Sequence, residues 1–191
     1  MLTVEDQPVS VERRLAAGDL CCPGCEGLLA RWGFAVVRAV RGLGGAVVRL
    51  RPRRARCRGC GITHVLLPVS ALPRRADLAE VIGVALAAKA AGAGHRQVAG
   101  WLSRPAETVR GWLRRFAVLA AGWRAVFTGV LVQAGVDPVL PAPAGSGFAD
   151  AVAVIVVAAS VLAGRWPALG TVSPWAFACA VTGGALLAPP R

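Results

Sequence analysis

The chain has 191 residues, enough for one or two compact domains with a buried core, and its formal net charge is +12. Its high mean hydropathy comes largely from alanine, glycine and valine rather than from the Leu, Ile and Phe that membrane spans favour. The charge is uneven, because residues 31–75 hold eleven arginines and no acidic residue. This segment therefore predicts a polyanionic partner.

The N-terminal segment, residues 1–20, carries acids near Met1 and has no apolar run of the length that a signal peptide needs. This start predicts a cytoplasmic protein. In the reducing cytoplasm structural disulfides are rare, so the six cysteines call for another explanation.

Two Cys-x-x-Cys motifs follow, "CPGC" at residues 22–25 and "CRGC" at residues 57–60, with 31 residues between them. Each pair can offer two thiolates to one ion, and two pairs complete the tetrahedral sulfur shell that Zn²⁺ prefers. We therefore predict a zinc site formed by Cys22, Cys25, Cys57 and Cys60. Pro23 inside the first turn favours Cys22 over its neighbour Cys21 as a ligand.

Two other interpretations of the paired cysteines stay open, a redox pair and small buried core residues. A redox Cys-x-x-Cys needs a βαβ setting, which surrounds neither motif. His64, four residues after Cys60, is a further candidate ligand, but four thiolates already fill the shell and we expect it to be a strand residue. Cys179 lies in an apolar stretch and is expected to be buried packing.

The segment between the two cysteine pairs has the pattern of a hairpin. The β-branched stretches "WGFAVVRAV" (32–40) and "AVVRLRPR" (46–53) flank the turn "RGLGG", and "THVLLP" (63–68) would add a third strand. This layout predicts a zinc ribbon over residues 21–70. We expect Arg51, Arg53 and Arg54 to contact phosphates; the alternative is a solvated face paired with acids elsewhere.

Residues 74–116 predict three helices. Asp77 and Glu80 resemble a capping box and begin a helix that runs to about Ala91, where "GAG" (92–94) ends it. A short helix over residues 95–102 precedes the turn "SRP", and Pro105 takes the first position of the third helix.

This order of helices is typical of a helix-turn-helix, in which a short helix braces a second that enters the major groove. Ala99 is small where the two helices would cross, Val109 and Trp112 would close the core, and Ser103 stands where glycine is usual. An ordinary three-helix bundle with a basic face is the alternative. The residues expected to contact DNA from this part of the chain are Arg96, Arg104, Glu107, Thr108, Arg110, Arg114 and Arg115.

From Cys22 to Phe116 the chain resembles an actinobacterial family of uncharacterised helix-turn-helix proteins with an N-terminal zinc ribbon. The residues that carry the resemblance are "CPGC", "RPRRARCRGCGITHVLLP", "LPRRADLAEVIG" and "AGAGHRQVAGWLSRPAETVRGWLRRF". This stretch is also similar to the N-terminal DNA-binding half of several insertion-sequence transposases. The resemblance implies zinc binding by the paired cysteines and DNA binding by Arg110, Arg114 and their neighbours. Glu26 departs from it, since a glycine normally follows the second cysteine of each pair.

A complete transposase is not expected. Its nuclease fold needs three carboxylates to hold two metal ions, and only Asp137 and Asp150 remain after Phe116. The sequence also contains no Ser/His/acid or Cys/His pattern, so we predict that the chain is not an enzyme.

The remainder, residues 117–191, predicts a helical region with a Pro/Gly-rich linker near residues 135–147. The third helix should continue beyond Phe116. Two apolar stretches, 151–164 and 166–190, are expected as buried helices rather than a membrane hairpin, because the first has only 14 residues before Arg165 and a span needs about 20.

Together these patterns predict an α+β chain: a small β zinc ribbon, a trihelical helix-turn-helix domain and a helical C-terminal region. The predicted function is sequence-specific binding of double-stranded DNA, as a transcriptional regulator or a mobile-element accessory factor. A homodimer and a mobile-element recombinase are further candidate partners. Two alternatives remain, a membrane-tethered zinc protein with its arginines on anionic lipid and an RNA-binding ribbon.

Overall fold

The computed structural model describes residues 1–135, 139–166 and 173–188, and these form an α+β fold, as predicted. They contain six α-helices, one mixed sheet of four strands and one sheet of two strands. In chain order the elements are β1 (Leu2–Val4), α1 (Pro8–Ala17), β2 (Leu29–Phe34), β3 (Arg38–Arg41), the 3-10 turn η1 (Leu43–Gly45), β4 (Val47–Leu50), β5 (Arg53–Cys57), β6 (Thr63–Pro68), α2 (Ala79–Ala90), α3 (His95–Leu102), α4 (Ala106–Ala134), α5 (Gly147–Arg165) and α6 (Pro174–Val181).

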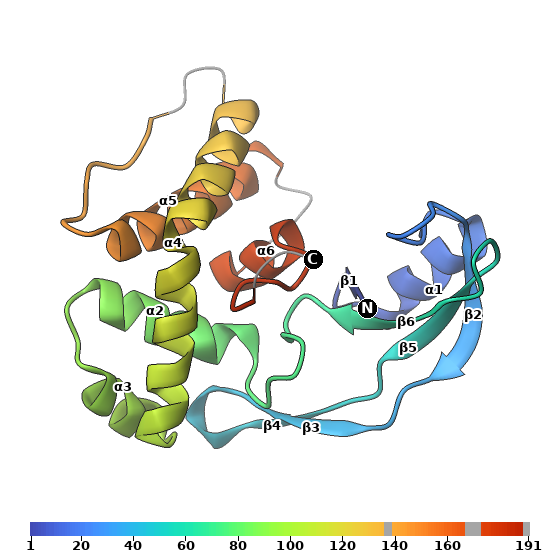
Figure 1. The fold of residues 1–191 in the computed structure, drawn as a ribbon, viewed down its shortest axis with the longest axis horizontal. Coiled ribbons are helices and arrows are strands. Elements are labelled where there is room, and N and C mark those ends of the chain that lie inside the picture. The colour runs from blue at the N-terminus through green and yellow to red at the C-terminus, as the bar shows by residue number, and fades with distance from the viewer. Residues whose placement is uncertain (136–138, 167–172, 189–191) are drawn as a thin grey trace.

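Two halves are visible in Figure 1, a β half with α1 and a helical half made by α2 to α6, and the β3–β4 hairpin runs between them. The larger sheet has the order β1-β6-β5-β2, with β1 parallel to β6 and the other pairs antiparallel. Its core is small and consists of Val4, Val11, Leu15, Leu20, Cys22, Leu29, Ala55, Cys57 and Leu66. Residues 1–20, predicted as a separate segment, therefore supply part of this core.

The turn of the β3–β4 hairpin forms where the sequence predicts it, but the predicted strands 32–40 and 46–53 are each divided: β2 ends at Phe34 before β3 begins, and β4 ends at Leu50 before β5 begins. The register of the hairpin runs from Arg38 opposite Leu50 to Arg41 opposite Val47. The turn is possible because Gly44 and Gly45 take left-handed backbone, with φ of 60° and 78°. The tip of the hairpin lies against the start of the helical half: the amide of Arg41 donates to Ala76 O at 2.7 Å and the amide of Leu78 donates to Arg41 O at 2.9 Å.

The predicted capping box is wrong. The helix α2 begins at Ala79 with Leu78 as N-cap, and no side chain caps it. The carboxylate of Asp77 pairs instead with two arginines, and Glu80 accepts a hydrogen bond from the hydroxyl of Ser173. The short helix α3 has the predicted bounds, and Ser103 after it is left-handed at φ 51°, where glycine is the usual residue.

The third predicted helix continues as expected, and α4 is one helix of 29 residues. Its buried residues recur every three or four positions and form a continuous stripe: Val109, Trp112, Leu113, Phe116, Ala120, Trp123, Phe127, Leu131 and Ala134. All of these residues except Ala134 pack with those of α2, α3, α5 and α6 into one core. Trp175 of α6 fills the space over Gly83 of α2, where a Cβ would lie 2.0 Å from the ring.

The C-terminal region agrees with the sequence as far as the structure describes it. Residues 139–146 are not helical, α5 and α6 follow, and Cys179 is fully buried as predicted. Residues 136–138 of the predicted linker, and residues 167–172, 189 and 190 of the second apolar stretch, lie outside the described residues. Both α4 and α5 are long and apolar enough to cross a membrane by length and composition.

Candidate metal centre and basic surface

The four paired cysteines come together at one end of the larger sheet. Their sulfur atoms all lie within 4.8 Å of one another, so Cys22, Cys25, Cys57 and Cys60 could hold a metal ion. The prediction that these four cysteines form one cluster is confirmed, and Cys21 lies outside it, exposed. Cys22 and Cys57 are buried, whereas Cys25 and Cys60 are exposed, so the cluster lies at the surface.

Each cysteine pair is held by the same backbone turn. The amide of Cys22 donates to Gly27 O at 2.9 Å, and the amide of Cys57 donates to Ile62 O at the same distance. Inside each turn, the amide of Glu26 donates to Cys22 O at 2.8 Å, and that of Gly61 donates to Cys57 O at 3.1 Å. Two similar loops therefore aim their thiols at one point.

Close packing around the sulfur atoms leaves no room for extra side chains. A Cβ on Gly27 would lie 2.9 Å from Cys57 Sγ and 3.4 Å from Cys25 Sγ. The amides of Gly59 and Cys60 point at Cys57 Sγ, at 3.3 and 3.4 Å. Such amide donors stabilise a thiolate.

The thiols differ in acidity because they share one small space. Hydrogen bonds, first from the Cys60 amide and then from the Cys25 thiol, the Gly59 amide and the Cys60 thiol, outweigh burial and lower the pKa of Cys57 to about 6. At Cys60 the Ile62 amide lowers the pKa, but contact with the Cys25 thiol, burial and the other two thiols outweigh it and raise the pKa to about 12. A bound divalent cation would remove this difference in protonation, because cysteine ligands bind metal as thiolates and release their protons.

His64 contacts the cysteine cluster at Cys22. It lies in β6, as predicted, and is 5% exposed. Its Nε2 is 3.3 Å from Cys22 Sγ and its Nδ1 is 3.4 Å from the terminal amine of Met1. Burial, with the nearby amino terminus, lowers the pKa of His64 and favours the neutral ring. In the tautomer protonated at Nε2, the ring can donate to the Cys22 sulfur and orient it.

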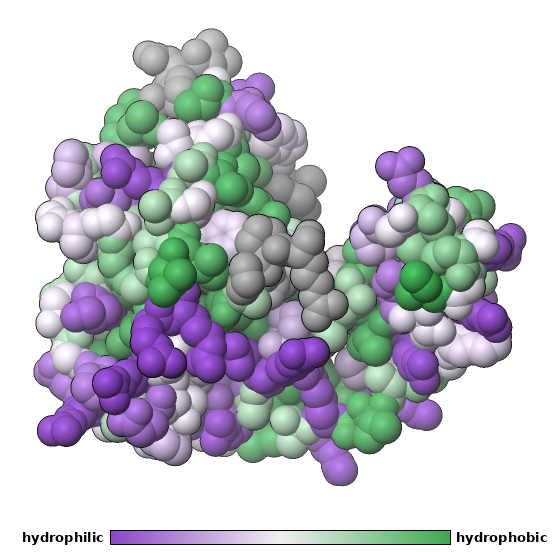
Figure 2. All heavy atoms as spheres, in the orientation of Figure 1, coloured by the Kyte–Doolittle hydropathy of each residue, from purple (hydrophilic) through white to green (hydrophobic). Residues whose placement is uncertain are grey.

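Hydrophilic side chains gather over α3 and the first turns of α4 on the face that Figure 2 shows, whereas the β3–β4 hairpin carries exposed hydrophobic side chains as well. Of the predicted ribbon contacts, Arg51 is exposed, with its guanidinium 4.8 Å from the centre of the Phe34 ring. Arg53 is less available for phosphate contact, because its Nε forms an ion pair with a Glu12 carboxylate oxygen at 2.8 Å. The geometry of this pair is not that of a hydrogen bond. Arg54 is half-buried on β5.

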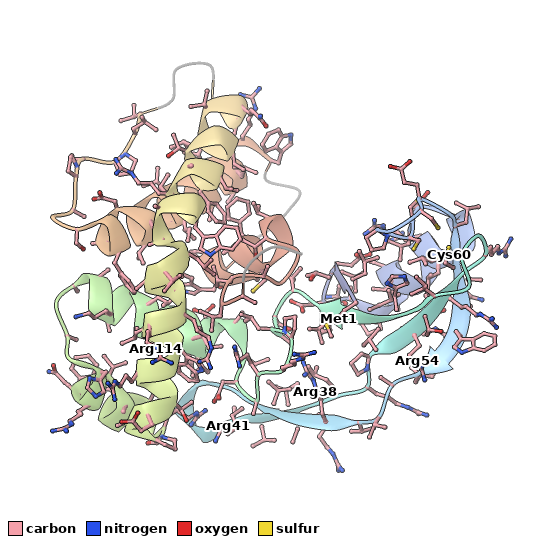
Figure 3. The ribbon with its side chains drawn as sticks, viewed as in Figure 1. Met1, Arg38, Arg41, Arg54, Cys60 and Arg114 are labelled. Carbon is pink, nitrogen blue, oxygen red and sulfur yellow. The ribbon has the colours of Figure 1, made fainter. Side chains whose placement is uncertain are left out.

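The predicted contacts of the helical half lie on α3, the following turn and α4. Most are exposed: Arg96, Glu107, Arg110, Arg114 and Arg115. Thr108 is half-buried, and Arg110 Nη1 lies 3.4 Å from Glu107 Oε2 one turn away. Figure 3 shows Arg114 on α4 and Arg54 on β5 at opposite ends of the hairpin. The structure therefore places the ribbon arginines and the α4 arginines on separate elements.

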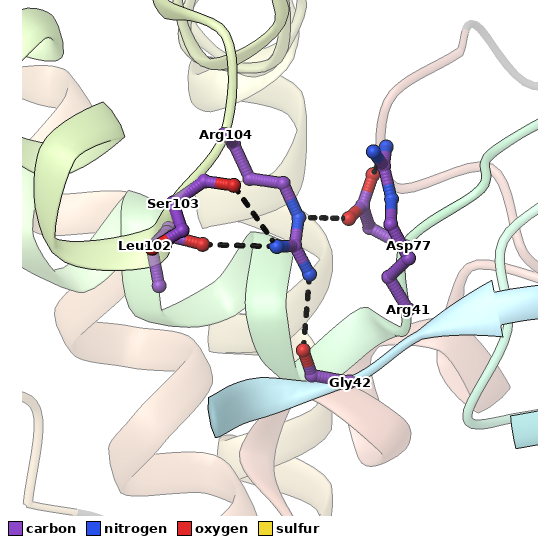
Figure 4. Close-up of polar contacts among 6 residues, drawn as sticks. All are labelled: Arg41, Gly42, Asp77, Leu102, Ser103 and Arg104. Carbon is purple, nitrogen blue, oxygen red and sulfur yellow. Dashed lines mark hydrogen bonds and ion pairs between the residues drawn. The ribbon is translucent and has the colours of Figure 1, made fainter. Parts of the chain in front are cut away.

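Arg104 has a different role from the predicted DNA contact. Its side chain is 6% exposed, and its Nε pairs with Asp77 Oδ1 at 2.5 Å, while Arg41 pairs with Asp77 Oδ2 at 2.8 Å (Figure 4). Its remaining donors reach the carbonyls of Gly42 at 3.0 Å, Leu102 at 3.0 Å and Ser103 at 3.2 Å. Arg104 therefore ties the α3–α4 turn to the hairpin tip, and four of its five N–H donors are engaged within the chain.

Sequence reasoning did not single out two exposed aromatic residues of β2. Trp32 is 50% exposed and Phe34 is 48% exposed. The guanidinium of Arg56 lies 4.7 Å from the Trp32 ring centre, and that of Arg53 lies 4.5 Å from the Phe34 ring centre. Their position in a predicted strand next to the arginine run was the available signal.

Comparison with known proteins identifies no relative of this chain. The chain matches no protein-family model, no curated protein and no solved structure. The support for a function therefore comes from the cysteine cluster, the α3–α4 helix pair and the exposed arginines.

Proposed function

We propose that this chain is a zinc-ribbon and helix-turn-helix protein that binds double-stranded DNA and has no catalytic role. The observation that carries the proposal is the helix pair: α3 has eight residues, a short turn follows, and α4 exposes Arg110 and Arg114 on the side away from its buried stripe. Such a pair can place the start of α4 in the major groove while α3 braces it.

Zinc is the metal that we propose for the cysteine cluster. Tetrahedral Zn–S bonds of about 2.3 Å place neighbouring sulfur atoms about 3.8 Å apart. The Cys22 and Cys60 sulfur atoms are 3.8 Å apart, and those of Cys25 and Cys57 are 3.4 Å apart. Four protein thiolates leave no open coordination position, which favours a structural rather than a catalytic ion.

The zinc assignment predicts about one zinc ion per purified chain by elemental analysis. Cys57→Ser removes a buried ligand and should abolish the bound zinc. Cys21→Ser is the matched control, because Cys21 is adjacent to the site but outside the cluster, and it should keep the metal. Protein that contains no zinc, or zinc that survives Cys57→Ser, would refute this assignment.

The DNA-binding proposal is tested by selecting a preferred duplex from a random pool and measuring affinity for it and for a scrambled duplex. Arg114→Ala should reduce discrimination between the two, by about 1–3 kcal/mol if Arg114 makes a bidentate contact with guanine. Arg51→Ala should weaken both duplexes alike and lower the salt dependence by about 0.9 log unit per lost phosphate contact. Arg13→Ala, on an exposed position of α1, is the control.

Two results would contradict this division of roles. If Arg51→Ala changed specificity and Arg114→Ala changed only general affinity, the roles of the two surfaces would be reversed. If neither substitution changed duplex binding, DNA would be the wrong partner.

The cellular role that we propose is transcriptional regulation or assistance to a mobile element in the cytoplasm. The resemblance of residues 22–116 to the DNA-binding half of insertion-sequence transposases supports the mobile-element role, with a recombinase as partner. A homodimer would suit a palindromic target. An adjacent transposase gene would support the mobile-element role.

Two alternative functions are each supported by one observation. The length and apolar composition of α4 and α5 support a membrane-tethered protein, which would cosediment with anionic vesicles. The exposed Trp32 and Phe34, with arginines on their rings, support a ribbon that stacks on single-stranded RNA. A clear preference for single strands over duplex would favour the RNA alternative.

A further inference from the structure

Acidic partners for the arginines of residues 31–75 are few in the described part of the chain. Glu12 pairs with Arg31 and Arg53, and Asp77 pairs with Arg41 and with Arg104 from outside that segment. The other ion pairs there join residues outside 31–75: Arg14–Glu5, Arg110–Glu107 and Arg124–Asp150.

Arg38, Arg54 and Arg75 are half-buried arginines without an ion pair among the described residues, and Arg38 and Arg75 lie nearest the junction of the two halves. In Arg38 the Nε and Nη2 atoms are shielded from solvent and have no hydrogen-bond partner among the described residues, and the same holds for Nε of Arg75. Burial lowers the pKa of Arg38, and burial together with the charge of Arg115 lowers that of Arg75. Removing a cation from water without pairing it costs free energy, so these side chains destabilise the free protein.

Both arginines flank the junction between the hairpin and the helical half. Arg38 begins β3, whose last residue is Arg41, and Arg75 precedes Asp77 by two residues. Arg41 and Asp77 form an isolated parallel β-bridge as well as a side-chain ion pair. Figure 3 shows Arg38 on the hairpin between Arg41 and the ribbon.

Asp77, the carboxylate at the junction, does not pair with either of the two arginines. Both carboxylate oxygens of Asp77 are already occupied, by Arg41 and Arg104. The nearby Arg115, on α4, adds a third positive charge. Among the described residues no carboxylate pairs with Arg38 or Arg75, so a bound anion would supply the counter-charge that they lack.

We propose that Arg38 and Arg75 form an anion site at this junction, and that a phosphate of the DNA backbone occupies it. The proposal rests on the proposed DNA-binding function and extends its contact surface from α4 to the hairpin. Guanidinium groups suit this ligand because their fixed fork of donors matches phosphate oxygens. The parallel Arg41–Asp77 bridge places Arg38 and Arg75 on adjacent backbone segments just before it, so one phosphate bound there would contact the hairpin and the start of the helical half.

The test measures the affinity for duplex DNA and the melting temperature of the free protein in two variants, Arg38→Gln and Arg75→Gln. Each substitution should weaken binding to the preferred and the scrambled duplex alike and reduce the salt slope by about 0.9. Each should leave the melting temperature of the free protein unchanged or higher, because an unpaired, desolvated cation is removed. Arg13→Gln, exposed on α1, should change neither quantity.

Stability separates a binding role from a structural one. If either substitution lowered the melting temperature and left the salt slope unchanged, the arginine would be structural and the proposal would be overturned. If both variants bound duplex like the unaltered protein while Arg114→Ala weakened its discrimination, the anion site would be wrong and the proposed function would stand.

A second measurement uses pyrophosphate alone and does not depend on duplex binding. Pyrophosphate should raise the melting temperature of the unaltered protein, and this rise should be reduced in the double variant Arg38→Gln/Arg75→Gln. An equal rise in both proteins would overturn the site. A rise that is lost in the double variant, together with unchanged duplex binding by that variant, would overturn the assignment to the DNA backbone and leave a site for a free phosphate.

Discussion

Glu26 and Gly61 occupy equivalent places in the two cysteine turns, and both have left-handed backbone, with φ of 59° and 73°. Glycine takes this conformation without strain, whereas a residue with a Cβ is disfavoured there by about 1–2 kcal/mol. Glu26→Gly should therefore raise the free energy of unfolding of the zinc-loaded ribbon, by about 0.5–1 kcal/mol after the greater entropy of glycine in the unfolded chain is subtracted. Denaturant unfolding of the metal-loaded protein measures this change.

The reciprocal change is Gly61→Ala, which should destabilise the same ribbon because it introduces the strain that Glu26 already carries. If Glu26→Gly destabilised the ribbon, the Glu26 side chain would have to make a compensating interaction. The equivalence of the two turns would then hold for the backbone only.

At the scale of elements, local patterns predicted the three helices after residue 74 and the turn of the hairpin, but not β1, α1 or the division of the strands on either side of that hairpin. The apolar repeat of α4, the bounds of α3 and the turn between β3 and β4 all follow from patterns within about ten residues of one another. The cysteine cluster was also predictable, although its halves are far apart, because thiol chemistry makes two Cys-x-x-Cys motifs complementary.

Elements joined by side chains from distant segments were not predictable in this way. Asp77 has the local spacing of a capping residue, yet its carboxylate pairs with Arg41, 36 residues before it, and Arg104, 27 residues after it. The buried guanidinium of Arg104 needs a charged partner more than the start of α2 needs a side-chain cap. The sequence around α2 does not show that Asp77 has a distant partner. The capping box and the DNA contact of Arg104 were therefore both predicted from neighbouring residues alone.

At the scale of the whole molecule, the two halves depend on the metal to different degrees. The core of the β half has nine buried residues, and two of them, Cys22 and Cys57, belong to the metal cluster. The helical half has a much larger core, whose only cysteine is Cys179. Small domains with so few core residues generally need a metal or a disulfide to stay folded.

Metal removal should therefore unfold the β half and leave the helical half folded. After chelation, iodoacetamide at pH 8 should modify the four clustered cysteines and Cys21, while Cys179 stays protected because burial, and to a lesser extent the charge of Asp6, raises its pKa to about 12 and keeps the thiol protonated. Mass spectrometry of the alkylated peptides measures which cysteines become accessible. Circular dichroism of the same sample measures how much helix remains. Modification of Cys179 under the same conditions would show that the helical half also depends on the metal. The Arg41–Asp77–Arg104 junction would be the route for such dependence, because it joins the ribbon hairpin to the α3–α4 turn.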